Sequence, residues 1–184
     1  AFTLFANDWL AVTENIWTHS GIQQGTETNN VLRFENAGQI VPPHEGTTST
    51  MTVTPGENGA VHAVANLTPA YAGDPAVTSW QRTIDFAGHK LTVSDAFALG
   101  SGTSAIFQVD TPVQPVSSGK TAQAGDLLIR VLTPANATLS ALGWTTQSDA
   151  DETYNSGWRL DVSGGTSGYV VELSVDKIFS NGFN

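Results

Sequence analysis

The chain contains no cysteine among its 184 residues. Disulfide bonds, thiolate catalysis and cysteine-ligated zinc sites are therefore excluded. This absence leaves the compartment open, because exported proteins without cysteine are common in bacteria. Stability must come from burial of apolar surface, and a chain of this length can bury about 70% of its unfolded surface. We expect one domain over residues 1–184.

Basic side chains are scarce. Seven lysines and arginines stand against seventeen aspartates and glutamates, which gives a formal charge of −10. Nucleic acids and anionic membranes are therefore disfavoured as partners, because both are bound through clusters of basic groups. The average field also repels a polymer of uronic acids. Such a ligand would need basic groups that are concentrated locally or supplied by another domain.

Long apolar runs are also missing. No segment approaches the roughly 20 apolar residues that cross a bilayer as a helix. The N-terminus begins directly in strand-like sequence, without the basic, apolar and small-residue regions of an export signal. We expect a mature chain or a piece of a longer one.

Apolar residues rarely recur at helical spacing, whereas alternation with a period of two is common. Residues 157–162 place Trp158, Leu160 and Val162 on one face of a strand. Residues 169–175 repeat this pattern. The glycine-rich segment 163–168 between them predicts a β-hairpin.

About a dozen short strands separated by turn residues predict an all-β, antiparallel sandwich of two stacked sheets. A tight turn at residues 87–89 predicts a second hairpin, and residues 113–124 are predicted to form one long loop. The remaining expected strands are 2–6, 9–13, 31–36, 50–54, 61–66, 79–86, 90–94, 105–110, 127–132 and 137–141.

The order of features near the N-terminus carries a resemblance. Two short apolar strands and a polar loop at residues 18–22 precede Asn29-Asn30-Val31-Leu32, and this segment ends in Gly38-Gln39. It resembles the start of the C-terminal β-sandwich of heparinase II/III-like polysaccharide lyases. Asn29 departs from that family, which usually has histidine at this position.

Three further segments are similar to the same family and extend the resemblance to about residue 175. The first covers residues 80–95: residues 80–86 are similar to the family's arginine-containing strand through Arg82, and residues 91–95 are similar to its neighbour, which ends in Val-Asp in that family. Asp110-Thr111-Pro112 resembles its Thr-Pro element after a hydrophobic strand. Residues 125–134 resemble a later strand with a proline exit.

The resemblance implies a larger enzyme. In that family a helical toroid precedes the sandwich, and an acidic polysaccharide lies between the two. The reaction is β-elimination, in which a base removes the C5 proton of a uronic acid while its carboxylate is neutralised. The base and the clamp come chiefly from the toroid, and a further histidine precedes the strand that residues 1–4 resemble. We therefore expect no activity from this chain alone, a toroid domain or companion chain as partner, and a secreted or periplasmic location.

The loop and turn that carry the resemblance also hold the first candidate site residues. His19 is a candidate acid/base group or sugar contact, and the alternative is a surface histidine bonded to a neighbouring hydroxyl. Asn29 and Asn30 are candidate ligands for a carboxylate or sugar hydroxyls. The alternative is that they bond their own backbone in a turn.

Four other side chains are candidate substrate contacts. His44 follows two prolines in a loop that we expect to be exposed and stiff. Trp17 and Trp144 border loops and are candidates for stacking on a sugar ring. Arg82 lies in phase with Trp80, so it either lines the cleft or forms an internal ion pair, for example with Asp85 or Asp95.

No cofactor is required by the sequence. The four histidines lack the short spacings of a compact metal site, although a divalent metal bound through distant residues is compatible with the chain. The acidic stretch 148–152 lacks the pattern of a calcium loop. A nucleophile elbow and a phosphate-binding glycine loop are also absent.

The sequence leads to the hypothesis of a β-sandwich that lines one wall of a lyase cleft for a uronic-acid-containing polysaccharide. Two alternatives from other classes stay open. One is a non-catalytic carbohydrate-binding module that uses exposed tryptophans. The other is a structural or adhesive surface module, which suits the many threonines, serines and glycines.

Overall fold

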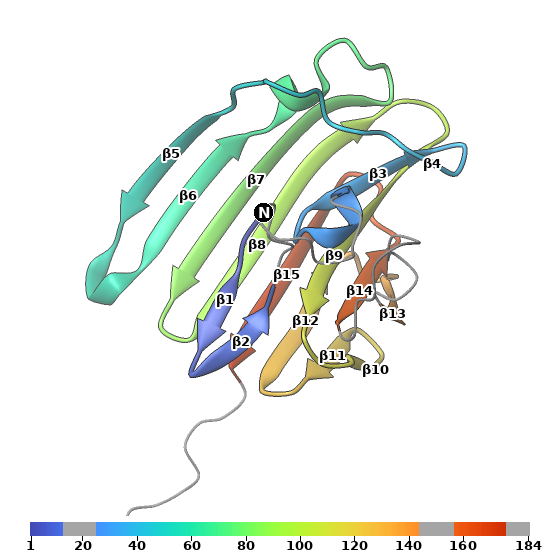
Figure 1. The fold of residues 1–184 in the computed structure, drawn as a ribbon. Coiled ribbons are helices and arrows are strands. Elements are labelled where there is room, and N and C mark those ends of the chain that lie inside the picture. Colours follow the sequence, from blue (N-terminus) through green and yellow to red (C-terminus); the bar gives the residue numbers. More distant parts are fainter. Residues whose placement is uncertain (13–24, 144–156, 176–184) are drawn as a thin grey trace, which may run out of the picture.

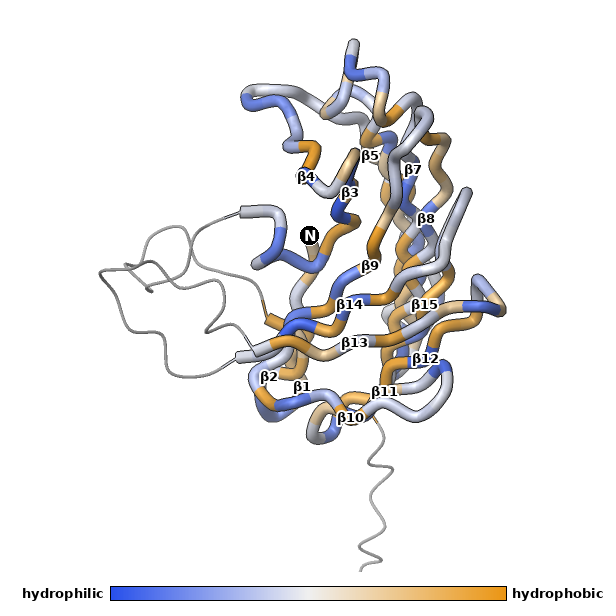
Figure 2. The backbone as a smooth tube through the Cα atoms, turned by 90° about the vertical axis from the view of Figure 1, so that its right-hand side faces the viewer, coloured by the Kyte–Doolittle hydropathy of each residue, from blue (hydrophilic) through white to orange (hydrophobic). Residues whose placement is uncertain are grey.

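A computed structural model describes residues 1–12, 25–143 and 157–175. In these segments the chain forms a large antiparallel sheet, a small antiparallel sheet and a separate two-stranded hairpin (Figure 1). Figure 2 shows the two sheets from the side as two stacked layers, with β3, β9, β14 and β13 in one layer and β7, β8, β15 and β12 in the other. The predicted antiparallel β-sandwich is confirmed.

The large sheet has eight strands, all paired antiparallel. In spatial order they are β10 (Val116–Ser118), β11 (Thr121–Ala124), β12 (Leu127–Thr133), β15 (Gly168–Val175), β8 (Lys90–Leu99), β7 (Val77–Ala87), β6 (Val61–Asn66) and β5 (Thr50–Pro55). The predicted hairpin of β7 and β8 is confirmed, with Ala87 paired to Lys90 across the turn.

The small sheet has five strands in the described residues. In spatial order they are β13 (Thr138–Gly143), β14 (Trp158–Ser163), β9 (Thr103–Thr111), β3 (Leu32–Asn36) and β4 (Gln39–Ile40). The separate hairpin consists of β1 (Leu4–Ala6) and β2 (Asp8–Ala11). Three short 3-10 helices occur in the described ranges: η1 (Thr26–Thr28), η2 (Glu57–Gly59) and η3 (Thr68–Tyr71).

Alternating apolar residues of both sheets meet in a common core. Phe34 on β3 lies edge-on to Trp80 on β7, with 5.4 Å between ring centroids. The ring centroids of Phe107 on β9 and Tyr169 on β15 lie 6.1 Å apart. The Tyr169 hydroxyl also donates a hydrogen bond of 2.7 Å to the carbonyl of Ala105, and burial raises the pKa of this phenol. The period-two pattern thus places one face of each strand in the dry layer between the sheets.

The predicted hairpin between residues 157–162 and 169–175 is wrong. β14 pairs with β13 and β9, whereas β15 pairs with β12 and β8, so the connection passes from one sheet to the other. Gly168 begins β15 at the end of this connection. A Cβ atom at its position would lie 2.6 Å from the carbonyl oxygen of Asp95, so glycine allows β15 to approach β8 closely. Two alternating strands joined by glycines have the same sequence pattern in a hairpin and in a corner between stacked sheets.

The predicted long loop at residues 113–124 is also wrong from Val116 onward. β10 and β11 form a hairpin there and extend the large sheet beyond β12. Their side chains are mostly small or polar, and only Ala122 and Ala124 of the two strands are buried. Such short strands with small inward side chains lack a strong period-two signal.

Leu160 tests the shared core. We expect Leu160→Ala to lower the free energy of unfolding by about 2–5 kcal/mol, because the side chain is fully buried between the layers. The matched control is Leu132→Ala on β12, where the side chain is 45% exposed and the expected loss is below about 1 kcal/mol. Urea denaturation measures both values, and equal losses would contradict this packing.

Candidate functional site

The segment between η1 and β3 joins three parts of the molecule through Asn30. Its side-chain amide nitrogen donates to the carbonyl oxygens of Phe2, at 2.6 Å, and Val12, at 2.7 Å. Its amide oxygen accepts the backbone N–H of Asp110 at 2.7 Å. Asn30 is fully buried, so it ties both ends of the N-terminal hairpin to β9.

The backbone carbonyl of Asn30 belongs to a second buried network, because it accepts a hydrogen bond of 3.0 Å from Arg82. Arg82 on β7 binds both carboxylate oxygens of Asp95 on β8, with N–O distances of 2.8 and 2.7 Å. The indole N–H of Trp80 donates to the same carboxylate at 2.7 Å. The internal ion pair is therefore confirmed, with Asp95 as the partner.

Aromatic rings enclose the Arg82 guanidinium between the two layers. Its central carbon lies 5.5 Å from the ring centre of Trp80 and 5.6 Å from that of Phe107. The Arg82 and Asp95 side chains are only 4% and 0% exposed. Both faces of the cation therefore meet protein, and the charge faces the core instead of an open cleft.

The Arg82–Asp95 pair can be tested by removing one partner at a time. We expect Arg82→Met and Asp95→Leu each to lower the free energy of unfolding by about 3–5 kcal/mol, because each leaves the other member of the pair as an uncompensated buried charge. Replacing both together with Arg82→Met and Asp95→Leu should cost much less than the sum. Chemical denaturation of the four proteins measures the coupling, and strictly additive losses would contradict it.

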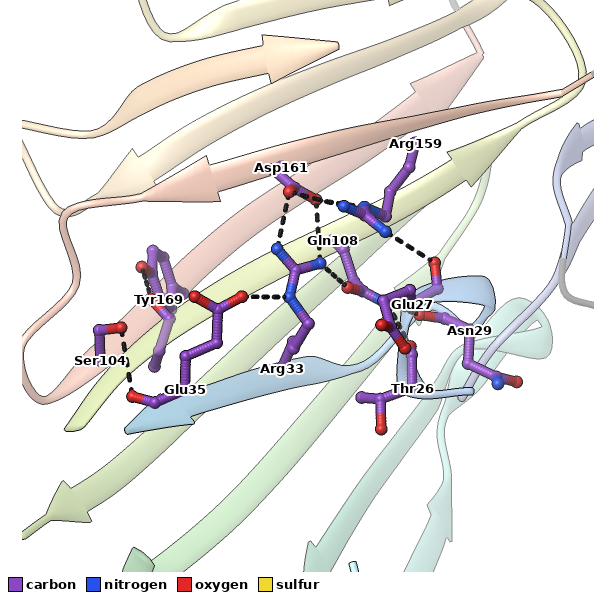
Figure 3. A network of polar contacts seen from close by, with 11 residues as sticks. Thr26, Glu27, Asn29, Arg33, Glu35, Ser104, Gln108, Arg159, Asp161 and Tyr169 are labelled. Carbon is purple, nitrogen blue, oxygen red and sulfur yellow. Dashed lines mark hydrogen bonds and ion pairs between the residues drawn. The ribbon is translucent and has the colours of Figure 1, made fainter. Parts of the chain in front are cut away.

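A third polar network covers the outer face of the small sheet, and Figure 3 shows it. Arg33 on β3 binds Glu35 at 2.8 Å, Asp161 at 2.8 Å and the side-chain oxygen of Gln108 at 2.7 Å. Arg159 binds the same Asp161 carboxylate, at 2.7 and 3.1 Å. Two guanidiniums and two carboxylates thus balance one another on β3 and β14.

The electrostatics of this network favour charged arginine. Burial acts to lower the pKa of Arg33, but hydrogen bonds and charge from Asp161 and Glu35 outweigh it and raise the pKa above its ordinary value. The side chains of Arg33 and Arg159 are each 6% exposed. Both guanidiniums are paired with carboxylates of the same chain, so they do not form an open binding site for an anion.

The outer network holds η1 on the sheet. The Gln108 amide nitrogen donates to the backbone carbonyl of Thr26 and, at 2.6 Å, to that of Asn29. Arg159 makes a longer contact of 3.4 Å with the carbonyl of Glu27. Gln108, Arg33 and Arg159 therefore position the turn that precedes Asn30, which the buried network holds from the other side (Figure 3).

The predicted site residues differ in burial, in bonding and in whether the structure describes them. Asn30 and Arg82 come together, but both are buried and bonded to protein groups. Asn29 is partly exposed at the end of η1, and its side chain donates to the carbonyl of Gly25 at 2.9 Å, as the turn alternative predicted. His44 lies on an exposed loop between β4 and β5, where its backbone N–H bonds Ala70. His19, Trp17 and Trp144 lie outside the described residues.

The sequence alone does not predict a site at Arg33, Gln108, Arg159 and Asp161. Each arginine precedes a carboxylate by two residues, as Arg33 does Glu35 and Arg159 does Asp161, so each pair shares a strand face. That spacing is a usable signal. The pairing of β9 with both β3 and β14, which brings the two pairs together around Gln108, has no local signature.

Over the described ranges, no group of three or more histidine or acidic side chains lies close enough to hold a metal ion. Within the same ranges, no helix is long and apolar enough to cross a membrane. No known protein-family model matches the chain, and no curated protein matches its sequence.

Asn30 provides a test of the junction. We expect Asn30→Asp to lower the free energy of unfolding by about 2–4 kcal/mol, because a carboxylate would face the carbonyl oxygens of Phe2 and Val12 and lose both donated bonds. The same change at exposed Asn136 should cost less than about 0.5 kcal/mol. Thermal or urea unfolding measures both changes. An Asn30→Asp variant with unchanged stability would contradict the role of Asn30 in holding the N-terminal hairpin on β9.

Proposed function

We propose that this chain is the β-sandwich part of a polysaccharide lyase that acts by β-elimination on a uronic-acid-containing polymer. One observation carries the proposal. The segments that resemble heparinase II/III-like lyases lie far apart in sequence, yet Asn30 from one of them and Arg82 and Asp95 from another form one buried network. Asp110, from a third, bonds Asn30 through its backbone N–H.

This convergence gives the resemblance a physical meaning. A buried arginine needs a carboxylate and further hydrogen bonds, so an arginine on one strand and an aspartate on its neighbour form a linked requirement. Asn30 satisfies the remaining polar contact from the turn before β3. The positions that carry the resemblance thus belong to one structural unit, and this supports the proposal.

The distribution of charge supports a division of labour with another domain. Six of the basic residues lie in the part of the chain that the structure describes, and five of them contact carboxylates of the same chain: Arg33, Arg82, Arg159, Lys90 and Arg130. β-Elimination needs a cation, or another neutralising group, at the substrate carboxylate and a base at C5. This chain has a net charge of −10, and its arginines are paired with its own carboxylates. It therefore suits the role of one wall of the cleft, while a helical toroid or companion chain supplies the base and the group that neutralises the substrate carboxylate.

The proposed wall is the outer face of the small sheet around η1. Asn29 lies there, partly exposed, on a turn that Gln108 and Arg159 hold from beneath. An amide in place of the family's histidine can hydrogen-bond a sugar hydroxyl or carboxylate but has no proton to exchange near neutral pH. Asn29 therefore acts in substrate orientation, and the acid/base step belongs elsewhere.

An activity assay tests the proposal. The full chain, alone and mixed with the proposed helical toroid as a neighbouring domain or companion chain, is incubated with alginate, heparan sulfate, chondroitin sulfate and polygalacturonate. Ultraviolet absorbance follows the unsaturated uronate that β-elimination creates. We expect no product from the chain alone and product from the combination with at least one polymer.

A variant locates the wall. In the active combination, Asn29→Ala should lower kcat/KM by about tenfold, equal to about 1.4 kcal/mol, because one substrate hydrogen bond is lost. Asn136→Ala, far from η1 in the sequence and exposed, is the matched control. Product from the chain alone would contradict the division of labour, and inactivity of the combination on every polymer would contradict the lyase proposal.

A further inference from the structure

The large sheet ends in an edge strand that carries no charge. Its two edges are β5, with six residues, and β10, with three. All six residues of β5, Thr-Met-Thr-Val-Thr-Pro, are exposed. Natural edge strands are commonly protected by shortness, charge, bulges or a covering segment. β5 pairs with β6 without a bulge and has only a proline at its last position.

The side chains of β5 divide cleanly between the two faces of the sheet. Met51 and Val53 lie in register with Arg82 and Ile84 through β6, on the face that the small sheet covers farther along. Here that face is open: Met51 is 66% and Val53 52% exposed. Figure 1 shows β5 and β6 extending to one side, away from the strands of the small sheet. The alternate residues of β5 are all threonine.

We propose that a second copy of this chain pairs with β5 through its own β5, antiparallel, about a two-fold axis at Thr52. In this register Thr52 lies opposite Thr52 of the other copy and Met51 opposite Val53. Thr50 then lies opposite Thr54. Threonine meets threonine on one face and apolar side chains meet on the other, which are favourable cross-strand pairs. A two-fold contact of this kind is closed, so it yields a dimer and not a fibre.

Length and lack of charge together favour this edge, because β10 is also uncharged but has only three residues. Each copy carries a formal charge of −10, so two copies repel one another at long range. β5 brings no charge into the contact. The nearest pair on the adjoining strands, His62 with Asp85 at 2.6 Å, lies on the opposite face of the sheet from Met51 and Val53. We therefore expect a weak dimer, with less than about 1,200 Å² buried, that strengthens when salt screens the repulsion.

This contact does not involve η1 or the outer face of the small sheet. Its failure would leave the proposed lyase role untouched, and failure of that role would leave the dimer untouched.

The absence of cysteine makes site-specific cross-linking a clean test. Under mild oxidation Thr52→Cys should form a disulfide-linked dimer at least about tenfold faster than Ser117→Cys on the other edge strand, because only Cys at the axis meets its own copy. Thr50→Cys alone should link slowly. The double variant Thr50→Cys with Thr54→Cys should link rapidly, which checks the register. Equal rates for Thr52→Cys and Ser117→Cys would overturn the proposal.

Sedimentation velocity over a concentration series supplies the second test, on the unmodified chain and two variants. Met51→Lys combined with Val53→Lys should raise the dimer dissociation constant at least about tenfold, because like charges would meet across the axis. Val116→Lys on β10, where the side chain is 70% exposed, should leave it unchanged. Far-ultraviolet circular dichroism verifies that both variants stay folded. A chain that stays monomeric at every concentration, in low and high salt, would overturn the proposal.

Discussion

The buried pair of Arg82 and Asp95 is the constraint on which the rest of the structure depends. Removing two charges from water is costly unless each finds a partner and its remaining hydrogen bonds. Here β7 supplies the cation and β8 the carboxylate, while Trp80 and the carbonyl of Asn30 satisfy further groups. Phe107 of the small sheet covers the guanidinium. These contacts together hold the two layers in their observed alignment.

The short segment that ends at Asn30 connects the buried Arg82–Asp95 pair to the outer face of the small sheet. Asn30 bonds the N-terminal hairpin, β9 and Arg82, while the carbonyls just before it receive bonds from Gln108 and Arg159 on the outer face. The segment is therefore held on two sides by networks with different partners. A turn fixed in this way can present Asn29 to a ligand without an additional ordering cost.

The same arginines explain why an acidic chain can carry a charged network without offering an open basic patch. Arg33 and Arg159 share Asp161, so the network is balanced and well bonded but nearly closed to solvent. An arginine that is paired with an internal carboxylate stabilises the fold but is not available to attract an anionic ligand. In the proposed lyase the field that attracts a uronate polymer therefore belongs to the partner domain, and this sandwich contributes shape and hydrogen bonds.

The sequence by itself determined the all-β class, most strand positions and the inward residues, because a pleated strand exposes alternate side chains to opposite faces. It also narrowed the partner of Arg82 to a few residues. The tertiary structure decided that β14 and β15 lie in different sheets, that Asp95 is the partner, and that Arg33, Gln108 and Asp161 meet. These outcomes depend on which strands become neighbours, and long-range pairing leaves no periodic trace in the strands themselves.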